Sequence, residues 1–558
     1  MDTSVSPDSL DLTTGTLNNF LTKNALPITN SENHQQVKWS QRHAPTQRLR
    51  ESIEQGLYGL QCNFYDYEGH EEYLIQRELL QPLAFAANKS DPDTMYMHQV
   101  MWQPDKEQFK QAMLDEINAH TENKHCKIIE RREVPEGVKV LPSVWAMKRK
   151  RRISTGKIYK WKARLNLHGG KQEHGINYWE TYAALLAWPT IQFMLTQAII
   201  MGWKTRQIDF TLAYPQAEAE CQLYMDIPKG FTVEGGNAVH CLKILKNIYG
   251  QRQAGRIWSL HLKKGLQGCG FTQSTVDECV FYKEQVIFMV YVDDAILISP
   301  KDMLIDKSLH DLCKSFNLTD EGNIADYLGI KVVKLSKEVI SLTQPHLIAS
   351  ILKDINFAGN TKSKNIPAAS TRLLQQDADG EAFNEHWDYR SVIGKLNFLE
   401  KSSRPDVAFA VHQCARFSAN PKKSHADAVK QIGRYLMGTL DKGLILRPDP
   451  KQSFLVWADA DFVGNWNQDT AILDVSTAKS RSGYLITYSG CPISWVSKMQ
   501  TEIALSTTES EYISLSLALQ ETIPMMRLIW EFKDKFNGEN IVSTPTIRCT
   551  LFEEIQEL

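Results

Sequence analysis

The chain has 558 residues, of which 42% are hydrophobic, and its formal net charge is -2. A chain of this length is too long for one hydrophobic core, so about three or four domains are expected. A net charge so close to zero gives no global field that attracts nucleic acid, so such binding must rest on local charged patches. The ten cysteines form no C-x-x-C pair and no zinc-like cluster with histidine. We therefore expect reduced thiols, with neither disulfides nor zinc.

The start of the chain and its most apolar stretch bear on the compartment. The opening residues MDTSVSPDSLDLTTG lack the basic segment and the apolar core of a secretory signal. The stretch Ala183–Trp203 is interrupted by Pro189 and by polar residues such as Gln192, which favours a buried helix over a membrane span. Residues 1–95 are rich in polar side chains and are expected to be mostly disordered. The sequence thus predicts a cytoplasmic or nuclear protein that is not secreted.

Regular structure is expected to begin near Pro104 with an amphipathic helix, because Phe109, Met113 and Ile117 recur every four residues. The next two segments, VKVLPSVWAMKRKRR and KIYKWKARLNLHG, alternate in polarity and are separated by Ser-Thr-Gly. This pattern predicts a β-hairpin.

The outer half of this hairpin is strongly basic. Its cations are Lys148, Arg149, Lys150, Arg151, Arg152, Lys157, Lys160, Lys162, Arg164 and Lys171, with no acidic residue between the first and the last. The pattern suits a solvated ribbon or a nuclear-import signal. It equally suits a finger that grips phosphates, with Tyr159 and Trp161 available for stacking on bases. These residues alone do not decide between the two interpretations.

A nearly continuous apolar run, VIFMVYVDDAILIS, is broken only by Asp293 and Asp294. Two adjacent carboxylates inside such a run are costly, so they indicate either the tip of a hairpin or a bound cation. An ordinary Asp-rich turn is the simpler alternative. Asp209 ends a second short apolar strand, where its simpler role is to cap the next turn. Carboxylates from separate strands that converge would suit the two Mg²⁺ ions of phosphoryl-transfer chemistry.

The sequence Tyr291-Val292-Asp293-Asp294 resembles the Y-x-D-D signature of reverse transcriptases, and its context resembles copia-type retrotransposons. The matching stretches include WKARLNLHGGKQEHGINYWETYA, QIDFTLAYPQAEAECQLYMDIPKGF, LKNIYGQRQAGRIWSLHL, GFTQSTVDECVFY and YRSVIGKLNFLEKSSRPDVAFAV. The resemblance extends over about residues 95 to 555 and implies an α+β right-hand polymerase joined to an α/β ribonuclease H-like domain. It places fingers and palm in residues 96–340, thumb and connection region in 341–450, and a truncated ribonuclease H-like domain in 451–558.

The resemblance also implies roles for individual residues. Asp209, Asp293 and Asp294 would bind two Mg²⁺ ions, with Mn²⁺ as an alternative. Lys162 and Arg164 would hold the incoming triphosphate, Tyr214 would close the sugar pocket, and Gln253 would pack beside the nucleotide. The implied activity is RNA-directed DNA synthesis from deoxynucleoside triphosphates, with a DNA primer and an RNA template as partners. Where the family usually has proline and arginine near the fingers, this chain has Ala184 and Gln192.

The C-terminal segments WADADFVGNWN and SRSGYLITYSGCPISWVSKMQTEIALSTTESEYISLSLALQE resemble the copia ribonuclease H domain. Asp459 and Glu511 match two metal ligands, with Asp461 and Glu509 as nearby alternatives. The family's third acid falls in Phe552-Glu553-Glu554-Ile555, where Glu554 stands in place of aspartate. This longer side chain and the early end of the chain make ribonuclease H activity doubtful.

Three functional hypotheses follow from the sequence: an active polymerase, an inactive retroelement remnant, and a nucleic-acid-binding protein without catalysis. Other enzyme classes fit poorly. His168-Gly169-Gly170 resembles an esterase oxyanion loop, but the chain has no G-x-S-x-G nucleophile elbow. It also lacks the G-x-x-x-x-G-K-[ST] phosphate loop of nucleotide hydrolases.

Overall fold

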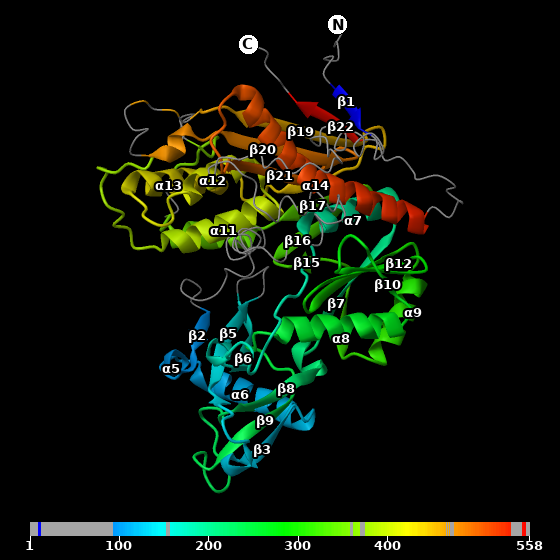
Figure 1. The fold of residues 1–558 in the computed structure, drawn as a ribbon, viewed down its shortest axis with the longest axis vertical. Helices are drawn as coiled ribbons and strands as arrows, with labels where there is room; N and C mark the ends of the chain where they lie inside the picture. The colour runs from blue at the N-terminus through cyan, green and yellow to red at the C-terminus, as the bar shows by residue number, and fades with distance from the viewer. Residues whose placement is uncertain are drawn as a thin grey trace, which may run out of the picture.

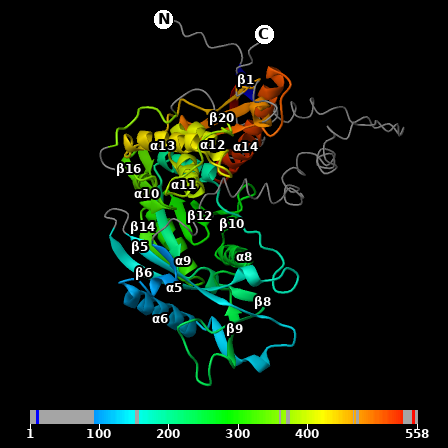
Figure 2. The same ribbon diagram turned by 90° about the vertical axis from the view of Figure 1, so that its left-hand side faces the viewer.

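The computed structural model describes residues 9–12, 93–151, 157–357, 361–368, 374–464, 466, 468, 474–536 and 549–553. The molecule is elongated (Figure 1 and Figure 2). Helix α6 (Lys106–Glu122) and strand β9 (His240–Lys246) lie at one end of its long axis, and α14 (Thr507–Phe536) and β20 (Arg481–Tyr488) lie at the other. The disorder expected for residues 1–95 concerns residues that lie outside the described part of the chain, apart from 9–12 and 93–95.

The middle of the molecule is a six-stranded sheet, the central sheet, in the order β10-β11-β12-β13-β7-β14. Its strands are β7 Lys204–Phe210, β10 Thr272–Gln273, β11 Val280–Lys283, β12 Val286–Tyr291, β13 Asp294–Ser299 and β14 Leu318–Gly322. The apolar run found in the sequence forms β12 and β13, which are buried along almost their whole length. Both faces of these strands are covered, which explains why their sequence is continuously apolar instead of alternating.

Three helices belong to this region: α7 Trp188–Ile200, α8 Ala254–Gly268 and α9 Asp302–Cys313. Helix α7 is the segment considered as a membrane span, and all its residues from Thr190 to Ala198 are buried in the protein. The expectation of a buried helix is confirmed. None of the helices in the described part of the chain is long and apolar enough to cross a membrane.

The predicted hairpin is also confirmed. Its strands β5 Ser143–Arg151 and β6 Ile158–Leu167 pair antiparallel, and β2 Thr94–Tyr96 joins them to complete a three-stranded hairpin sheet. The amphipathic helix is α6, Lys106–Glu122; it begins two residues after Pro104, with Asp105 at the N-cap position. The remaining elements of this end are α5 Met97–Val100 and a second sheet of β3 Cys126–Glu130, β4 Val140–Leu141, β8 Glu218–Met225 and β9 His240–Lys246.

The chain after the central sheet forms a small sheet and a helical cluster. The sheet contains β15 Asp326–Tyr327, β16 Ile330–Ser336, β17 Val339–Thr343 and β18 Leu444–Leu446. The helices are α10 Pro345–Asp354, α11 Tyr389–Ser402, α12 Ala408–Ala415 and α13 Lys423–Met437. These helices share a core of their own, which includes Ile351, Leu396 and Val429.

The C-terminal sheet has the order β1-β22-β19-β20-β21. Its strands are β1 Ser9–Leu12, β19 Phe454–Asp461, β20 Arg481–Tyr488, β21 Cys491–Met499 and β22 Cys549–Glu553, and α14, Thr507–Phe536, packs against β19 and β20. Strand β22 runs parallel to β19, whereas the other pairs are antiparallel. Strand β1 pairs with β22, so the two ends of the chain meet at one edge of this sheet (Figure 1).

The C-terminal sheet does not form a separate core. A single cluster of buried apolar residues runs from the central sheet into β19, β20 and α14. Near the end of α14, Phe532 packs its ring against Trp203. The neighbouring Glu531 is 4% exposed and accepts hydrogen bonds from Ser274 Oγ, from Thr275 N at 2.8 Å and from Tyr282 OH at 3.2 Å. Helix α14 is therefore fixed to the central region by both packing and hydrogen bonds.

Replacing Glu531 by alanine should weaken this attachment. The substitution leaves buried donors without an acceptor, so we expect a loss of about 2–4 kcal/mol in the free energy of unfolding. Urea denaturation measures the change. Asp534→Ala, an exposed position on the same helix, is the control and should shift stability by less than about 0.5 kcal/mol. Equal effects of the two substitutions would contradict the assigned role of Glu531.

Candidate active site

The backbone brings the acidic residues found in the sequence together. Asp294 begins β13 and lies directly opposite Asp209 of β7 in the antiparallel register. Tyr291 of β12 pairs with Asp294, so Val292 and Asp293 form a two-residue turn between the strands. Asp209 and Asp293, distant in sequence, thus lie at the same end of the central sheet. All three aspartates are partly exposed.

Like charges and burial act together on these carboxylates. Burial, followed by the negative charges of Asp293 and Asp209, raises the pKa of Asp294 to about 7. Burial and Asp293 also raise the pKa of Asp209. A fourth acid, Glu321 of β14, has its pKa raised by burial and by Asp209. The cluster therefore has an excess of negative charge that a nearby cation would stabilise.

A pocket of about 320 Å³ opens beside these residues. Its walls come from the hairpin sheet, the central sheet and four connecting segments: Arg164, Ala213, Tyr214, Tyr249, Tyr291, Val292, Asp293, Asp294 and Leu328. Four residues singled out in the sequence, Arg164, Tyr214, Asp293 and Asp294, thus line one cavity. In the described part of the chain, no three His, Cys, Asp or Glu side chains are gathered into a ready-made metal site.

One face of the hairpin supplies positive charge to the pocket. Strand residues alternate between faces, and Lys162 and Arg164 lie on the same face because two positions separate them. Burial raises the pKa of Asp209, and the positive charges of Lys150, on the neighbouring strand, and of Lys162 and Arg164 partly offset this increase. Burial, followed by the charges of Arg164 and Lys150, lowers the pKa of Lys162 to about 8. Lys150 is a site residue that the sequence left within the general basic patch.

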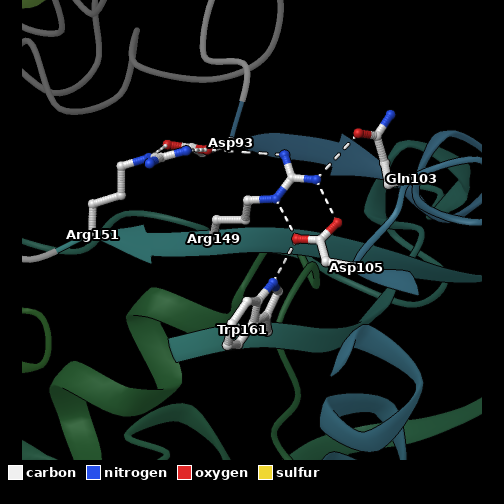
Figure 3. Close-up of polar contacts among 6 residues, drawn as sticks. All are labelled: Asp93, Gln103, Asp105, Arg149, Arg151 and Trp161. Atoms are coloured by element: carbon white, nitrogen blue, oxygen red, sulfur yellow. Dashed lines mark hydrogen bonds and ion pairs between the residues drawn. The ribbon is translucent and has the colours of Figure 1, made fainter. Parts of the chain in front are cut away.

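Residues on the other face of the hairpin bind carboxylates of neighbouring segments (Figure 3). Arg149 and Trp161 lie opposite each other in the register. Arg149 donates to Asp105 at 2.6 Å and 2.7 Å, and Trp161 Nε1 donates to the same carboxylate at 2.6 Å. Arg151 donates to Asp93 at 2.8 Å. These two acids come from outside the basic segment, so on this face Arg149, Arg151 and Trp161 bind carboxylates of the protein itself.

A stack of side chains that the sequence did not reveal links the hairpin to the central region. The guanidinium of Arg164 lies 3.7 Å from the centre of the Tyr249 ring, and that ring lies 4.9 Å from the Tyr214 ring. Burial raises the pKa of both tyrosines. The stack fixes Arg164 and Tyr214 relative to each other across the pocket. Nothing in the sequence around Tyr249 indicates this contact, because it depends on the approach of two separate elements.

Gln253, expected to pack beside a nucleotide, lies apart from this stack. It occupies the N-cap position of α8, is 1% exposed, and does not line the pocket. Its amide accepts a hydrogen bond from Gln172 at 3.0 Å and approaches the carbonyl oxygen of Asn177 at 3.4 Å. In this structure Gln253 therefore joins the loop before α7 to the start of α8.

The acids expected for a ribonuclease H-like site lie on separate elements of the C-terminal region. Asp459 is on β19 and is exposed, as is Asp461, while Glu511 is 9% exposed on α14. Ser514 Oγ donates to the Asp459 carbonyl at 2.6 Å, which fixes α14 against β19. Glu509 accepts from Leu505 N at 2.7 Å at the start of α14. Glu554 lies outside the described residues, and β22 places the backbone of Glu553 beside Ala458.

The sequence of the chain is similar to those of known proteins. Residues 126–370 match the family described as "Reverse transcriptase (RNA-dependent DNA polymerase)". The chain is 32% identical over 453 residues to the retrovirus-related Pol polyprotein from transposon TNT 1-94 of Nicotiana tabacum. The aligned region covers 79% of this chain and 33% of that protein. Residues 126–370 thus match a reverse transcriptase domain and are similar to those of copia-type transposons.

Other similarities agree with this assignment or are too distant to add to it. The Pol polyprotein from transposon RE1 of Arabidopsis thaliana is 29% identical over 447 residues, covering 79% of this chain and 29% of that protein. The chain therefore spans about a third of the length of these two curated relatives. A structure of the foamy viral protease-reverse transcriptase with double-stranded DNA aligns with a TM-score of 0.40 and 11% identity, covering 81% of this chain and 70% of that one. That structural similarity is too weak to support an argument.

The Asp105 contacts predict a specific effect on stability. Asp105→Asn removes the charge that holds Arg149 and Trp161, so we expect a loss of about 1.5–3 kcal/mol. The Arg149 hydrogen bond is the main reason that the pKa of Asp105 is lowered from 3.8 to about 2. This stabilisation should be present above about pH 4 and lost as the pH falls towards 2.

Thermal unfolding of Asp105→Asn at pH 7 and at pH 3 tests this prediction. Glu107→Gln is the matched control, because Glu107 is an exposed acid on the same helix with a local partner, Lys110. The control should change stability by less than about 0.5 kcal/mol. A similar change for both substitutions would show that Asp105 does not hold the hairpin.

Proposed function

We propose that this reverse transcriptase domain is an active RNA-directed DNA polymerase that extends a DNA primer on an RNA or DNA template. The observation that carries the proposal is the pocket itself. Asp293, Asp294 and the neighbouring Asp209 meet the cationic face of the hairpin across a single cavity. Primer extension requires negative charge that holds cations on one side and positive charge that holds phosphates on the other.

The proposed division of the chain follows from the same arrangement. Residues 96–340 would form fingers and palm, with the hairpin sheet as the fingers and the central sheet as the palm. Residues 341–450 would form the thumb and connection region, and residues 451–558 the ribonuclease H-like domain. The order of strands and helices along the chain supports this division. We propose that nuclease activity is weak or absent, because Glu554 stands where the family has aspartate.

The donor set of the acidic cluster fits divalent cations. Mg²⁺ prefers carboxylate oxygens, and Asp209, Asp293 and Asp294 supply three such groups whose mutual repulsion a cation would relieve. Two Mg²⁺ ions bound there would stabilise the charge that develops on the attacking and leaving oxygens. The protein's own contribution is to hold the three carboxylates on two adjacent strands and a tight turn, so that little rearrangement is needed.

The opposite wall of the pocket suits a nucleoside triphosphate. Arg164 is held by the Tyr249 ring, and Lys162 and Lys150 add positive charge on the same face. These cations would bind the triphosphate, with Arg164 able to form paired hydrogen bonds to its oxygens. Tyr214 lines the same pocket, and we propose that its ring contacts the sugar. The other partners of the reaction would be the RNA template and the DNA primer.

Asp293→Asn should abolish DNA synthesis. The amide keeps the shape of the side chain but removes the charge that holds a cation, so we expect a loss of at least about 10²-fold in kcat. The measurement is extension of oligo(dT) on poly(rA) with Mg²⁺ or Mn²⁺. Asp306→Asn is the control, because Asp306 is an exposed aspartate outside the pocket. A folded wild-type protein that extends no primer with either metal would instead support an inactive retroelement remnant.

Tyr214 should set the choice between deoxyribonucleotides and ribonucleotides. A tightly packed ring leaves no room for a 2'-hydroxyl, so Tyr214→Val should raise kcat/KM for ATP much more than it lowers that for dATP. Tyr224→Val, at a buried tyrosine away from the pocket, should leave the ratio unchanged. If Tyr214 is only a core aromatic, its loss would cost about 2–5 kcal/mol of stability and reduce the use of both substrates alike. An unchanged ratio would therefore remove Tyr214 from the site.

A further inference from the structure

The turn that carries Asp293 contains a residue in an unfavourable conformation. Val292 has φ of 59° and is the first of the two residues between β12 and β13. Positive φ at this position of a two-residue hairpin turn is normally adopted by glycine. A β-branched residue such as valine is strained there, because its side chain crowds the backbone. The turn must therefore be held in place by contacts from its surroundings.

Both carbonyl groups of the turn accept a hydrogen bond from another element. Trp258 Nε1, on α8, donates to the Val292 carbonyl at 2.6 Å. The backbone N–H of Phe210, on β7, donates to the Asp293 carbonyl at 2.8 Å. The second bond extends the β7–β13 pairing and does not depend on any side chain. The first is a side-chain contact to the strained residue itself, so a single substitution can remove it.

The surroundings of Trp258 make it a rigid anchor. The side chain is 2% exposed, and its ring packs edge-to-face on Phe210 at 5.3 Å and on Phe316 at 6.1 Å. Trp258 does not line the pocket, whereas Val292 does. The indole thus contacts the turn without lining the cavity. It cannot contact a nucleotide in the pocket, but it can determine where Asp293 lies.

We propose that Trp258 is a positioning residue for polymerase catalysis: its indole N–H holds Val292 in the left-handed conformation and thereby fixes Asp293 and Asp294. This inference rests on the proposed function. A buried tryptophan could instead serve packing alone, and the two roles differ in what they predict. Packing alone changes stability, whereas positioning changes the rate of the folded enzyme. Displacement of a reacting group by about 1 Å can reduce a rate by about 10²-fold.

Trp258→Phe keeps an aromatic ring but removes the donor. In extension of oligo(dT) on poly(rA), we expect kcat for dTTP to fall by roughly 10-fold or more, while KM changes by less than about threefold. Leu262→Val is the matched control. Leu262 is a buried residue of the same helix, and its aliphatic side chain cannot form a hydrogen bond to the turn. Its kcat, corrected for the folded fraction, should stay within about twofold of the wild-type value.

A second substitution tests the mechanism directly. Val292→Gly removes the strain, so the turn should depend less on Trp258. The fall in kcat caused by Trp258→Phe should therefore be at least about threefold smaller in the Val292→Gly background than in the wild type. Equal falls in the two backgrounds, or a fall matched by the Leu262→Val control, would overturn the proposal.

The same four proteins separate this inference from the proposed function. If the wild type extends no primer, the proposed function fails. The effect of Trp258→Phe in the wild-type and Val292→Gly backgrounds is then measured as a shift in Tm instead of a fall in kcat. Under the proposal, Trp258→Phe lowers Tm at least about twice as much in the wild-type background as in Val292→Gly, because only the strained turn needs the hydrogen bond. Identical Tm shifts in the two backgrounds would overturn the inference whatever the activity of the chain.

Discussion

Electrostatic repulsion among carboxylates at one end of the central sheet is the constraint around which the active-site region is organised. Asp209 and Asp294 face each other across two strands, and Asp293 follows in the adjoining turn. Burial, followed by the charges of Asp293 and Asp209, raises the pKa of Asp294 to about 7. An arrangement of this kind persists only where the surrounding fold fixes it. Here β7, β13 and the indole of Trp258 hold the backbone that carries the three aspartates.

The basic hairpin provides positive charge near these carboxylates from only one of its two faces. Arg149 and Trp161 point to one side, where Asp105 binds both and ties the strands to the start of α6. Lys162 and Arg164 lie on the other side, where Arg164 lines the pocket and both positive charges act on Asp209. Asp105 and Asp93 neutralise Arg149 and Arg151 on one face. The cations of the other face include Lys162 and Arg164, which we propose as ligands of a triphosphate.

Local patterns were enough to predict much of this architecture. The apolar run around Asp293 and Asp294 indicated the tip of a hairpin or a bound cation, and the structure shows a hairpin, with Asp293 in the turn and Asp294 at the start of β13. The alternating basic segments predicted the β5–β6 hairpin, and the four-residue spacing of Phe109 and Met113 predicted α6. Each of these features depends on residues close together in sequence. Short-range periodicity is therefore sufficient to predict these helices and hairpins.

The features that the sequence did not predict all depend on contacts between distant segments. Asp105 neutralises Arg149 from outside the basic segment, and Tyr249 meets Arg164 only when two elements approach each other. Glu531 joins α14 to a loop more than 250 residues earlier in the chain. For the same reason, the continuous core shared by the central and C-terminal sheets could not be recognised from separate sequence motifs. Such contacts carry no periodic signal, so only the folded structure reveals them.

The central proposal is that Asp209, Asp293 and Asp294 form a divalent-cation site. Titration of the protein with Mn²⁺, followed by electron paramagnetic resonance of the free ion, measures this directly and does not depend on primer, template or turnover. The account predicts that wild-type protein binds Mn²⁺, that Mg²⁺ competes, and that Asp209→Asn weakens the binding at least about tenfold, because a charged ligand is lost. Binding that is absent from the folded wild type, or that is unchanged in Asp209→Asn, would contradict the account.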